Sequence, residues 1–184
     1  MRIVGGTFKG RSLAGPTAAA TRPTSDRVRE AIFNILTHGI DGFTQEGARV
    51  LDLFAGTGAL GLEAMSRGAR VCQFVDDSAE ARGLIRRNAD ALGLIGQVKI
   101  WRRDATKLGP CAPQPGFDLV FADPPYGKGL GEKALVSLIE GAWLNPAAVV
   151  VLEEAEKVVV GEVPGLMVFD LRTYGDTQVR FYRT

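Results

Sequence analysis

One stretch of the chain, residues 50–64, constrains the fold more than any other. An apolar run of strand length ends in Gly-x-Gly-x-x-Gly, formed by Gly56, Gly58 and Gly61, and passes directly into a helix-forming segment. A strand, a tight glycine turn and a helix N-terminus let the backbone approach a ligand closely, and the exposed N–H groups favour a negatively charged ligand group. Nicotinamide and flavin folds use the same pattern, so it predicts a ligand site without choosing the ligand.

Asp52 narrows the choice of ligand because it lies inside the strand, shortly before Gly56. A carboxylate in a central strand is costly unless it has a partner. The pyrophosphate of a dinucleotide is anionic and gains nothing from this carboxylate, whereas the ammonium and sulfonium of S-adenosylmethionine do gain. We therefore expect S-adenosylmethionine as the cofactor and disfavour a dehydrogenase. The predicted cofactor site includes Asp52, Phe54, Gly56 and Gly58.

From residue 49 onward, apolar segments of strand length alternate with helix-forming segments. Strands are predicted at 49–54, 70–75, 97–101, 117–122 and 147–152, and helices at 59–67, 78–92 and 132–140. Short apolar strands separated by helices indicate a mostly parallel sheet that is covered on both faces. The end departs from this pattern, because segments 167–174 and 177–182 flank a Gly-Asp turn and predict an antiparallel hairpin. The sequence thus predicts a Rossmann-like α/β fold with a seven-stranded sheet.

Basic charge gathers at the N-terminal end of the chain. Residues 1–29 carry six basic side chains and one acidic one, although the net charge of all 184 residues is only +1. Charge concentrated in this way is typical of a patch that binds phosphate backbones, and the alternative is a solvated arm that contacts nothing. The predicted phosphate contacts are Arg2, Lys9, Arg11, Arg22 and Arg27.

The same end of the chain is predicted to extend from one main domain. Residues 2–13 alternate loosely and suggest a small hairpin or an extended arm, and a connector is predicted at 14–21. A Thr-Ser-Asp run at 24–26 follows a proline and offers N-caps to a helix that Gly39 can end. The predicted division is a basic arm, residues 1–24, and a single domain, residues 25–184.

The composition is that of an ordinary globular domain, with 46% hydrophobic and 23% charged residues. No apolar run approaches the ~20 residues that span a bilayer and no signal peptide is evident, so we expect a cytoplasmic protein without a membrane partner. Cys72 and Cys111 are predicted to be buried free thiols, and neither a disulfide framework nor a metal site has support. The lone histidine, His38, is expected to be structural.

Acidic residues follow several of the predicted strands. Ligands of an open parallel sheet bind at the carboxyl ends of its strands, so these side chains are expected to meet one ligand there. Asp76 lies twenty residues after Gly56, where a carboxylate can accept hydrogen bonds from ribose hydroxyls. Asp104 and Ala105 follow the third strand and are expected to meet the adenine amino group. Each carboxylate could instead belong to a loop or cap a helix.

The most specific motif is Asp123-Pro124-Pro125-Tyr126, directly after the fourth predicted strand. Proline fixes φ and keeps the preceding residue out of the helical region, so Asp123 and Pro124 are predicted to be extended. The Asp123 carboxylate and the Pro124 carbonyl then form a rigid pair of acceptors for the two hydrogens of an exocyclic amino group. Tyr126 offers a face on which a planar base can stack. The alternative is a proline-terminated strand with a structural tyrosine.

The glycine-loop stretch and the Asp-Pro-Pro-Tyr motif together resemble the amino-group class of S-adenosylmethionine-dependent methyltransferases. More narrowly, residues 2–6, 9–11 and 22–30 resemble the bacterial 16S rRNA guanine-N2 methyltransferases, and the likeness covers nearly the whole chain. The resemblance implies a class I methyltransferase fold, methyl transfer to N2 of a guanine in 16S rRNA, and catalytic roles for the four motif residues. Many relatives carry Glu where this chain has Asp76, a shorter carboxylate with the same chemistry.

The implied substrate sets a further condition. A base stacked in RNA cannot enter such a pocket, so the guanine is expected to be flipped out or unpaired, with Tyr126 replacing the lost stacking. The implied partner is 16S rRNA, as naked RNA or within a small-subunit assembly intermediate. Alternatives are methylation of adenine N6 in DNA, a protein-glutamine methyltransferase, whose signature usually begins with Asn where this chain has Asp123, and an RNA assembly factor that binds the cofactor without catalysing.

Overall fold

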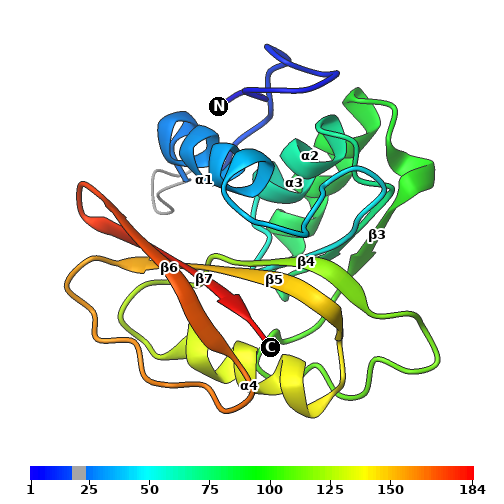
Figure 1. Cartoon of the computed structure of the whole chain (residues 1–184). Coiled ribbons are helices and arrows are strands. Elements are labelled where there is room, and N and C mark those ends of the chain that lie inside the picture. The colour runs from blue at the N-terminus through cyan, green and yellow to red at the C-terminus, as the bar shows by residue number, and fades with distance from the viewer. Residues whose placement is uncertain (18–23) are drawn as a thin grey trace.

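The computed structural model describes residues 1–17 and 24–184, and its centre is a seven-stranded sheet (Figure 1). The strands are β1 (Arg49–Leu53), β2 (Val71–Val75), β3 (Val98–Trp101), β4 (Phe117–Ala122), β5 (Leu144–Ala155), β6 (Met167–Tyr174) and β7 (Thr177–Arg183). Their order across the sheet is β3-β2-β1-β4-β5-β7-β6. Strands β1 to β5 pair in parallel, and β7 pairs antiparallel with β5 and β6. The predicted parallel sheet with a terminal hairpin is confirmed.

The described residues form four α-helices, which cover both faces of the sheet (Figure 1). They are α1 (Asp26–His38), α2 (Ala59–Ser66), α3 (Ala79–Ala91) and α4 (Leu130–Glu140), and a short 3-10 helix, Ile95–Gln97, precedes β3. Helices α1, α2 and α3 lie on one face and α4 lies on the other (Figure 1). Neighbouring residues of β1 serve opposite faces, since Val50 packs in the core under the three helices and Leu51 in the core under α4. Burial on both faces is why the strands read as continuous apolar runs.

Local signals set the helix ends much as the sequence predicts. Ser25 caps α1 by accepting a hydrogen bond from the Val28 N–H at 3.2 Å, and Gly39 is the C-cap of the same helix. Ser78 caps α3 by accepting from the Ala81 N–H at 3.3 Å. Each serine satisfies a backbone donor that has no partner within its helix.

Two elements are longer than predicted. Helix α4 begins earlier, at Leu130, because Gly129 precedes it in the left-handed conformation with φ of 66° and serves as its N-cap. Strand β5 continues to Ala155 because its last residues, including Glu153 and Glu154, pair with β7. The longer strand therefore carries two acidic side chains into the sheet.

The N-terminal segment, residues 1–14, is packed against the domain. Ile3 is fully buried and Leu13 is 6% exposed, and both belong to the core under α1, α2 and α3. The predicted hairpin is present as a single antiparallel bridge between Arg2 and Ser12. A solvated arm that contacts nothing is therefore wrong for this segment. The predicted connector falls partly outside the described residues.

The remaining expectations concern single residues. Cys72 and Cys111 are both buried and free, as predicted. His38 lies in the last turn of α1. Over residues 1–17 and 24–184, no helix is long and apolar enough to cross a membrane, and no group of His, Cys, Asp and Glu could hold a metal ion.

Candidate active site

The loop between β1 and α2 adopts the left-handed conformations that its glycines favour. The φ angle is 54° at Phe54, 58° at Gly56 and 80° at Gly58, and Gly58 is the N-cap of α2. A phenylalanine rarely adopts positive φ, so its surroundings impose this shape on the loop. A Cβ atom added to Gly56 would meet only the Phe54 carbonyl oxygen, at 3.9 Å. The loop thus starts a helix and has open space beside it, as a ligand cradle requires.

Asp52 lies on β1 and contacts the helix that follows the loop. Its side chain is 1% exposed, Oδ2 accepts from the Gly61 N–H at 2.9 Å, and Oδ1 has no hydrogen-bond partner among the described residues. Burial raises the pKa of Asp52 to about 8. The hydrogen bond from the Gly61 N–H opposes this shift, and the Asp76 carboxylate adds to it. A buried acceptor without a partner is costly, and an ammonium group from a ligand would satisfy it and favour the ionised carboxylate. The residue therefore fits the cofactor that the sequence predicts.

Asp76 and Asp104 are both engaged with the backbone of their own loops. Asp76 accepts from the Gly56 N–H with one oxygen and from the Ser78 N–H with the other, both at 2.9 Å. Asp104 is exposed and accepts from the Thr106 N–H and hydroxyl, and these bonds lower its pKa. Both carboxylates thus have a structural role, and ligand contact through their other lone pairs stays a prediction.

The Asp-Pro-Pro-Tyr motif lies beside the start of the glycine loop because β4 and β1 are neighbours in the sheet. The Asp123 N–H donates to the Leu53 carbonyl at 3.4 Å. Asp123 and Tyr126 are partly buried, Pro124 is buried and Pro125 is exposed. The fold thus brings together the two motifs that the sequence singles out, although about seventy residues separate them.

A chain of side-chain contacts surrounds the motif. The Thr24 hydroxyl oxygen lies 2.9 Å from Asp123 Oδ2 and 2.8 Å from Glu153 Oε2. The Tyr126 hydroxyl donates to Glu153 Oε1 and lies 3.5 Å from the Thr177 hydroxyl. We call Thr24, Asp123, Tyr126 and Glu153 the carboxyl network. It joins the motif to the start of α1 and to β5.

Glu153 and Glu154 are site residues that the motifs do not reveal. Both are buried on β5, at 4% and 2% exposed, and Glu154 Oε1 accepts from the Gly127 N–H at 3.0 Å, directly after the motif. A signal for them is present in the sequence, because two acids in an apolar strand are as costly as Asp52 is in β1. The predicted strand ends just before them.

Crowded acids change the titration of the network. Burial and the neighbouring Glu153 carboxylate raise the pKa of Asp123 well above its usual range, and the hydrogen bond from Thr24 opposes this shift. Burial and Glu153 also raise the pKa of the Tyr126 phenol. Two carboxyl groups this close resist ionising together, which is an arrangement typical of functional sites.

A cleft of about 350 Å³ opens beside the carboxyl network. Its walls include Thr24, Arg27, Tyr126 and Glu153 together with the turn between β6 and β7. The volume lies within the range of small-ligand pockets, roughly 300–1,000 Å³. Solvent or a ligand can thus reach the network from this side.

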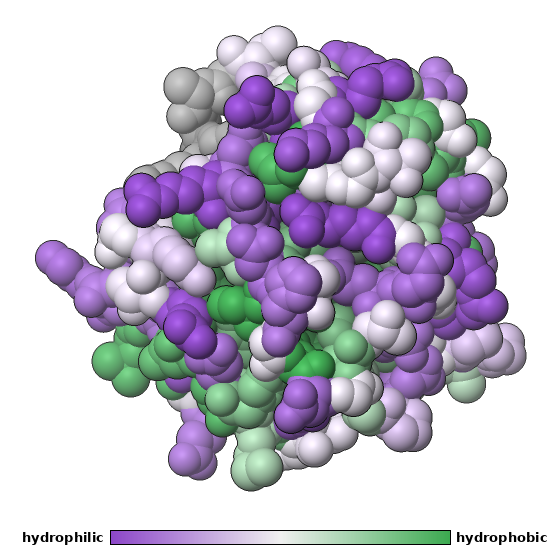
Figure 2. Space-filling view, turned by 45° about the horizontal axis from the view of Figure 1, so that its top comes forward, coloured by the Kyte–Doolittle hydropathy of each residue, from purple (hydrophilic) through white to green (hydrophobic). Residues whose placement is uncertain are grey.

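The structure describes four of the five predicted phosphate contacts: three lie in the N-terminal segment, residues 1–14, and Arg27 lies in α1. Arg27 lines the cleft, and Arg2 and Lys9 are exposed on the N-terminal side of the molecule. Arg11 donates to the Ala91 carbonyl at the end of α3 at 2.7 Å, and Arg22 lies outside the described residues. Hydrophilic side chains cover much of the upper part of the face shown in Figure 2, which carries the N-terminal segment and α1. Among the cations that the structure describes, Arg27 borders the cleft beside the carboxyl network.

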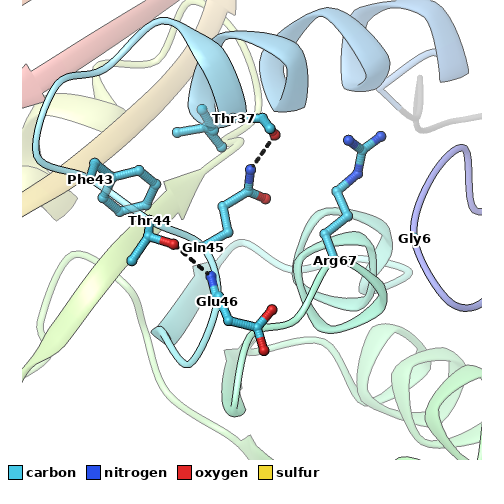
Figure 3. Close-up of a pocket in the computed structure, with 8 residues that line it drawn as sticks. Gly6, Thr37, Phe43, Thr44, Gln45, Glu46 and Arg67 are labelled. Atoms are coloured by element: carbon cyan, nitrogen blue, oxygen red, sulfur yellow. Dashed lines mark hydrogen bonds between the residues drawn. The ribbon is translucent and has the colours of Figure 1, made fainter.

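A second cavity, of about 380 Å³, lies apart from these residues (Figure 3). It is enclosed by the ends of α1 and α2 and by the segment before β1, and it includes Thr37, Gln45 and Arg67. The Gln45 amide donates to the Thr37 hydroxyl at 2.6 Å. The segment before β1 leads into the amino end of that strand, whereas Asp123 follows the carboxyl end of β4. None of the predicted site residues in the described part of the chain lines this cavity.

Comparison with known proteins shows what the chain as a whole is similar to. Residues 1–183 match the family described as "Conserved hypothetical protein 95". YlbH of Bacillus subtilis (strain 168), provisionally named as an rRNA methyltransferase, is 40% identical over 187 residues, which cover 100% of this chain and 98% of that protein. Ribosomal RNA small subunit methyltransferase D of Escherichia coli (strain K12) is 37% identical over 154 residues, which cover 83% of this chain and 74% of that protein.

A solved structure is similar over nearly the whole length. The Escherichia coli protein yhhF, provisionally described as a methyltransferase, has 29% sequence identity and a TM-score of 0.82, with 99% of this chain and 96% of that chain covered. The sheet order and the antiparallel C-terminal strands are those of the class I methyltransferase fold.

Proposed function

The chain belongs to the family described as conserved hypothetical protein 95, and on this premise we propose that it methylates the exocyclic N2 of a guanine in the 16S rRNA of the small ribosomal subunit. The observation that carries the proposal is the placement of Asp123-Pro124-Pro125-Tyr126 beside the glycine loop, at the ends of neighbouring strands β4 and β1. Relatives named as small-subunit rRNA methyltransferases support the choice of RNA as the substrate.

The proposed methyl donor is S-adenosylmethionine, which when bound supplies a methyl group whose C–S bond breaks, with the electron pair left on sulfur. The open space beside Gly56 and the unsatisfied Oδ1 of Asp52 fit a ligand that carries an ammonium group. Asp76 and Asp104 are proposed to contact ribose and adenine through lone pairs that their backbone bonds leave available. Phe54, Gly58 and Ala105 complete the proposed site.

The motif residues are proposed to position the acceptor nitrogen. The lone pair of a guanine amino group is delocalised into the ring, which makes it a poor nucleophile. Asp123 and the Pro124 carbonyl would accept its two hydrogens and direct the lone pair out of the ring plane, which partly offsets the lost delocalisation. Pro125 stiffens this edge, and the ring of Tyr126, with its hydroxyl held by Glu153, would stack on the base. Positioning of this kind supplies most of the acceleration that such a reaction needs.

The RNA must deliver an unstacked base to this pocket, so we propose that the target guanine is flipped out or unpaired. Arg27 borders the cleft and is the described cation best placed to hold the flanking phosphates. The proposed substrate is either naked 16S rRNA or a small-subunit assembly intermediate in the cytoplasm.

Incubation with radiolabelled S-adenosylmethionine and 16S rRNA from a strain that lacks the gene, followed by nucleoside analysis, tests the proposal. Label recovered as N2-methylguanosine is the expected result. Label in N6-methyladenosine, or in protein alone, would transfer the assignment to one of the rival amino-group methyltransferases. Cofactor binding with no label in RNA from naked or partly assembled subunits would instead identify an assembly factor that does not catalyse.

A further inference from the structure

The position of the Thr24 hydroxyl bears on how many protons the Asp123 and Glu153 carboxyl groups carry. It lies within hydrogen-bond distance of two carboxyl groups, 2.9 Å from Asp123 Oδ2 and 2.8 Å from Glu153 Oε2. A hydroxyl has one hydrogen, so it can donate to only one of these oxygens. The other oxygen can form a hydrogen bond with Thr24 only if its own carboxyl group carries a proton. Thr24 is 8% exposed and Glu153 is 4% exposed, so neither contact is a loose surface encounter.

We infer that Asp123 and Glu153 share one proton through Thr24, and that these three residues form a relay that removes the proton released when the guanine nitrogen is methylated. This inference rests on the proposed function for its second part alone. The shared proton is a property of the protein without any ligand. Asp123 would touch the substrate and is catalytic in that sense, whereas Thr24 and Glu153 act through it as positioning residues.

The relay accounts for every atom in the proton step. At the start, the Asp123 carboxyl donates from Oδ2 to the Thr24 oxygen, Thr24 donates to Glu153 Oε2, and Asp123 Oδ1 accepts from the guanine amino group. Formation of the N–C bond leaves the nitrogen positively charged, with one proton too many. That proton passes to Asp123 Oδ1, the Oδ2 proton passes to Thr24, and the Thr24 proton passes to Glu153. Asp123 ends with one proton as before, and Glu153 has gained one.

The surroundings of Glu153 suit the end of such a relay. Glu153 lines the cleft, so the proton it gains can leave to solvent from that side. Its Oε1 accepts the Tyr126 hydroxyl, which leaves Oε2 directed at Thr24. Asp52 and Glu154 add to the rise in the pKa of Asp123, while Arg27 and Asp176 share the walls of the cleft with Glu153. Burial and the neighbouring Glu153 carboxylate raise the pKa of Asp123, which favours a proton on that group.

Infrared difference spectra of the ligand-free protein test the shared proton without any activity. Asp123→Asn and Glu153→Gln should each abolish or shift the same protonated-carboxyl band near neutral pH, because the two acids hold one proton between them. Asp52→Asn serves as the control, since it removes a different buried carboxyl group and should leave this band in place. Persistence of every protonated-carboxyl band in both network variants would overturn the shared proton.

Single-turnover methyl transfer tests the relay itself. Thr24→Val should lower the rate about 100-fold with an unchanged KM for RNA, which is the lower end of the range of general acid–base effects, and Thr24→Ser should restore it. Thr37→Val removes a hydroxyl at the other end of α1 and should change nothing.

A wild-type rate in Thr24→Val would exclude the relay. If the wild-type protein methylates no RNA at all, the proposed function fails and the relay with it, while the infrared result still decides whether the proton is shared.

Discussion

Two clusters of buried charge lie on this sheet and its helices, and they use charge in opposite ways. In the first, which we call the ion cluster, Glu63 lies between Arg29 and Arg67, at 3.5 Å and 2.9 Å from their Nε atoms. The side chains of Arg29 and Glu63 are both fully buried. In the second, the carboxyl network, Asp123 and Glu153 face the hydroxyl groups of Thr24 and Tyr126.

The groups that face the buried acids distinguish a structural role in the ion cluster from a chemical role in the carboxyl network. In the ion cluster two guanidinium groups face Glu63, which also accepts from the Val4 N–H at 2.9 Å, so the paired charges anchor the N-terminal segment to α1 and α2. In the carboxyl network like charges are crowded, which favours proton uptake. Burial alone therefore does not identify a functional acid. The kind of group that faces it does.

The largest expected effect comes from removing the acid at the centre of the network. Asp123→Ala should reduce methyl transfer by about 10³-fold or more, the size of loss that follows removal of a key transition-state contact. Affinity for S-adenosylmethionine should stay nearly intact, and the free energy of unfolding should not fall, because a crowded carboxyl group has been removed. Transfer assays and cofactor titration measure both quantities, with the exposed Asp41→Ala as control. Unchanged turnover would reject the assignment.

The matching change in the ion cluster should affect stability instead. Glu63→Gln removes the carboxylate that Arg29 and Arg67 share and leaves Arg29 with Asp26 alone. Removing one partner of a buried pair costs about 3–5 kcal/mol of unfolding free energy. Below the unfolding transition, the transfer rate per folded molecule should match the wild type. Urea denaturation measures the loss, and exposed Glu80→Gln is the control. A loss below about 1 kcal/mol, the value of a surface pair, would remove the contrast between the clusters.

A smaller effect concerns Asp52, a buried acid outside both clusters, and should appear as a dependence of stability on pH. The pKa of Asp52 is about 8 in the folded chain against 3.8 ordinarily, so between these values the folded state holds a proton that the unfolded state has lost. Stability should therefore fall as pH rises through this window, by at most about 1.4 kcal/mol per pH unit. Asp52→Asn should remove this fall, so the stability of the variant relative to the wild type should increase as pH rises from 5 to 8. Thermal melts of both proteins at several pH values measure this change. A difference in Tm that stays the same from pH 5 to pH 8 would contradict the raised pKa of Asp52.

The smallest expected effect concerns the cation beside the network. Arg27→Ala should weaken RNA binding and reduce the slope of log affinity against log salt by about 1, the contribution of one phosphate contact. Its stability should stay within about 0.5 kcal/mol of the wild type, as for other surface changes. Arg172→Ala on β6, whose partner is Asp170, is the matched control and should leave the slope unchanged. Equal slopes in both variants would exclude Arg27 as a phosphate contact.

Periodicity and capping residues predict most of this fold. The alternation of apolar runs gave the strand positions, and the serines before α1 and α3 cap their helices as expected. The Asp-Pro-Pro-Tyr motif could be identified because proline restricts the backbone locally. These features depend on neighbours within a few positions of one another.

The contacts between distant segments could not be predicted in the same way. Thr24 and Asp123 are 99 positions apart, and only the docking of α1 against the sheet brings them together. Glu153 lies beyond the predicted end of its strand, because pairing with β7 rather than local propensity extends β5. Asp76 was expected to serve a ligand, and its bonds to Gly56 and Ser78 show that it also shapes the loop.

The packed N-terminal segment has a consequence for how the chain is made. Asn88 of α3 exchanges hydrogen bonds with Ala14, 74 positions earlier, and Ser66 holds Gly5 and Phe8. Residues 1–14 are synthesised before α3 and must therefore stay exposed until α3 has been made. Docking of residues 1–14 against α2 and α3 is therefore a late step in the assembly of the domain.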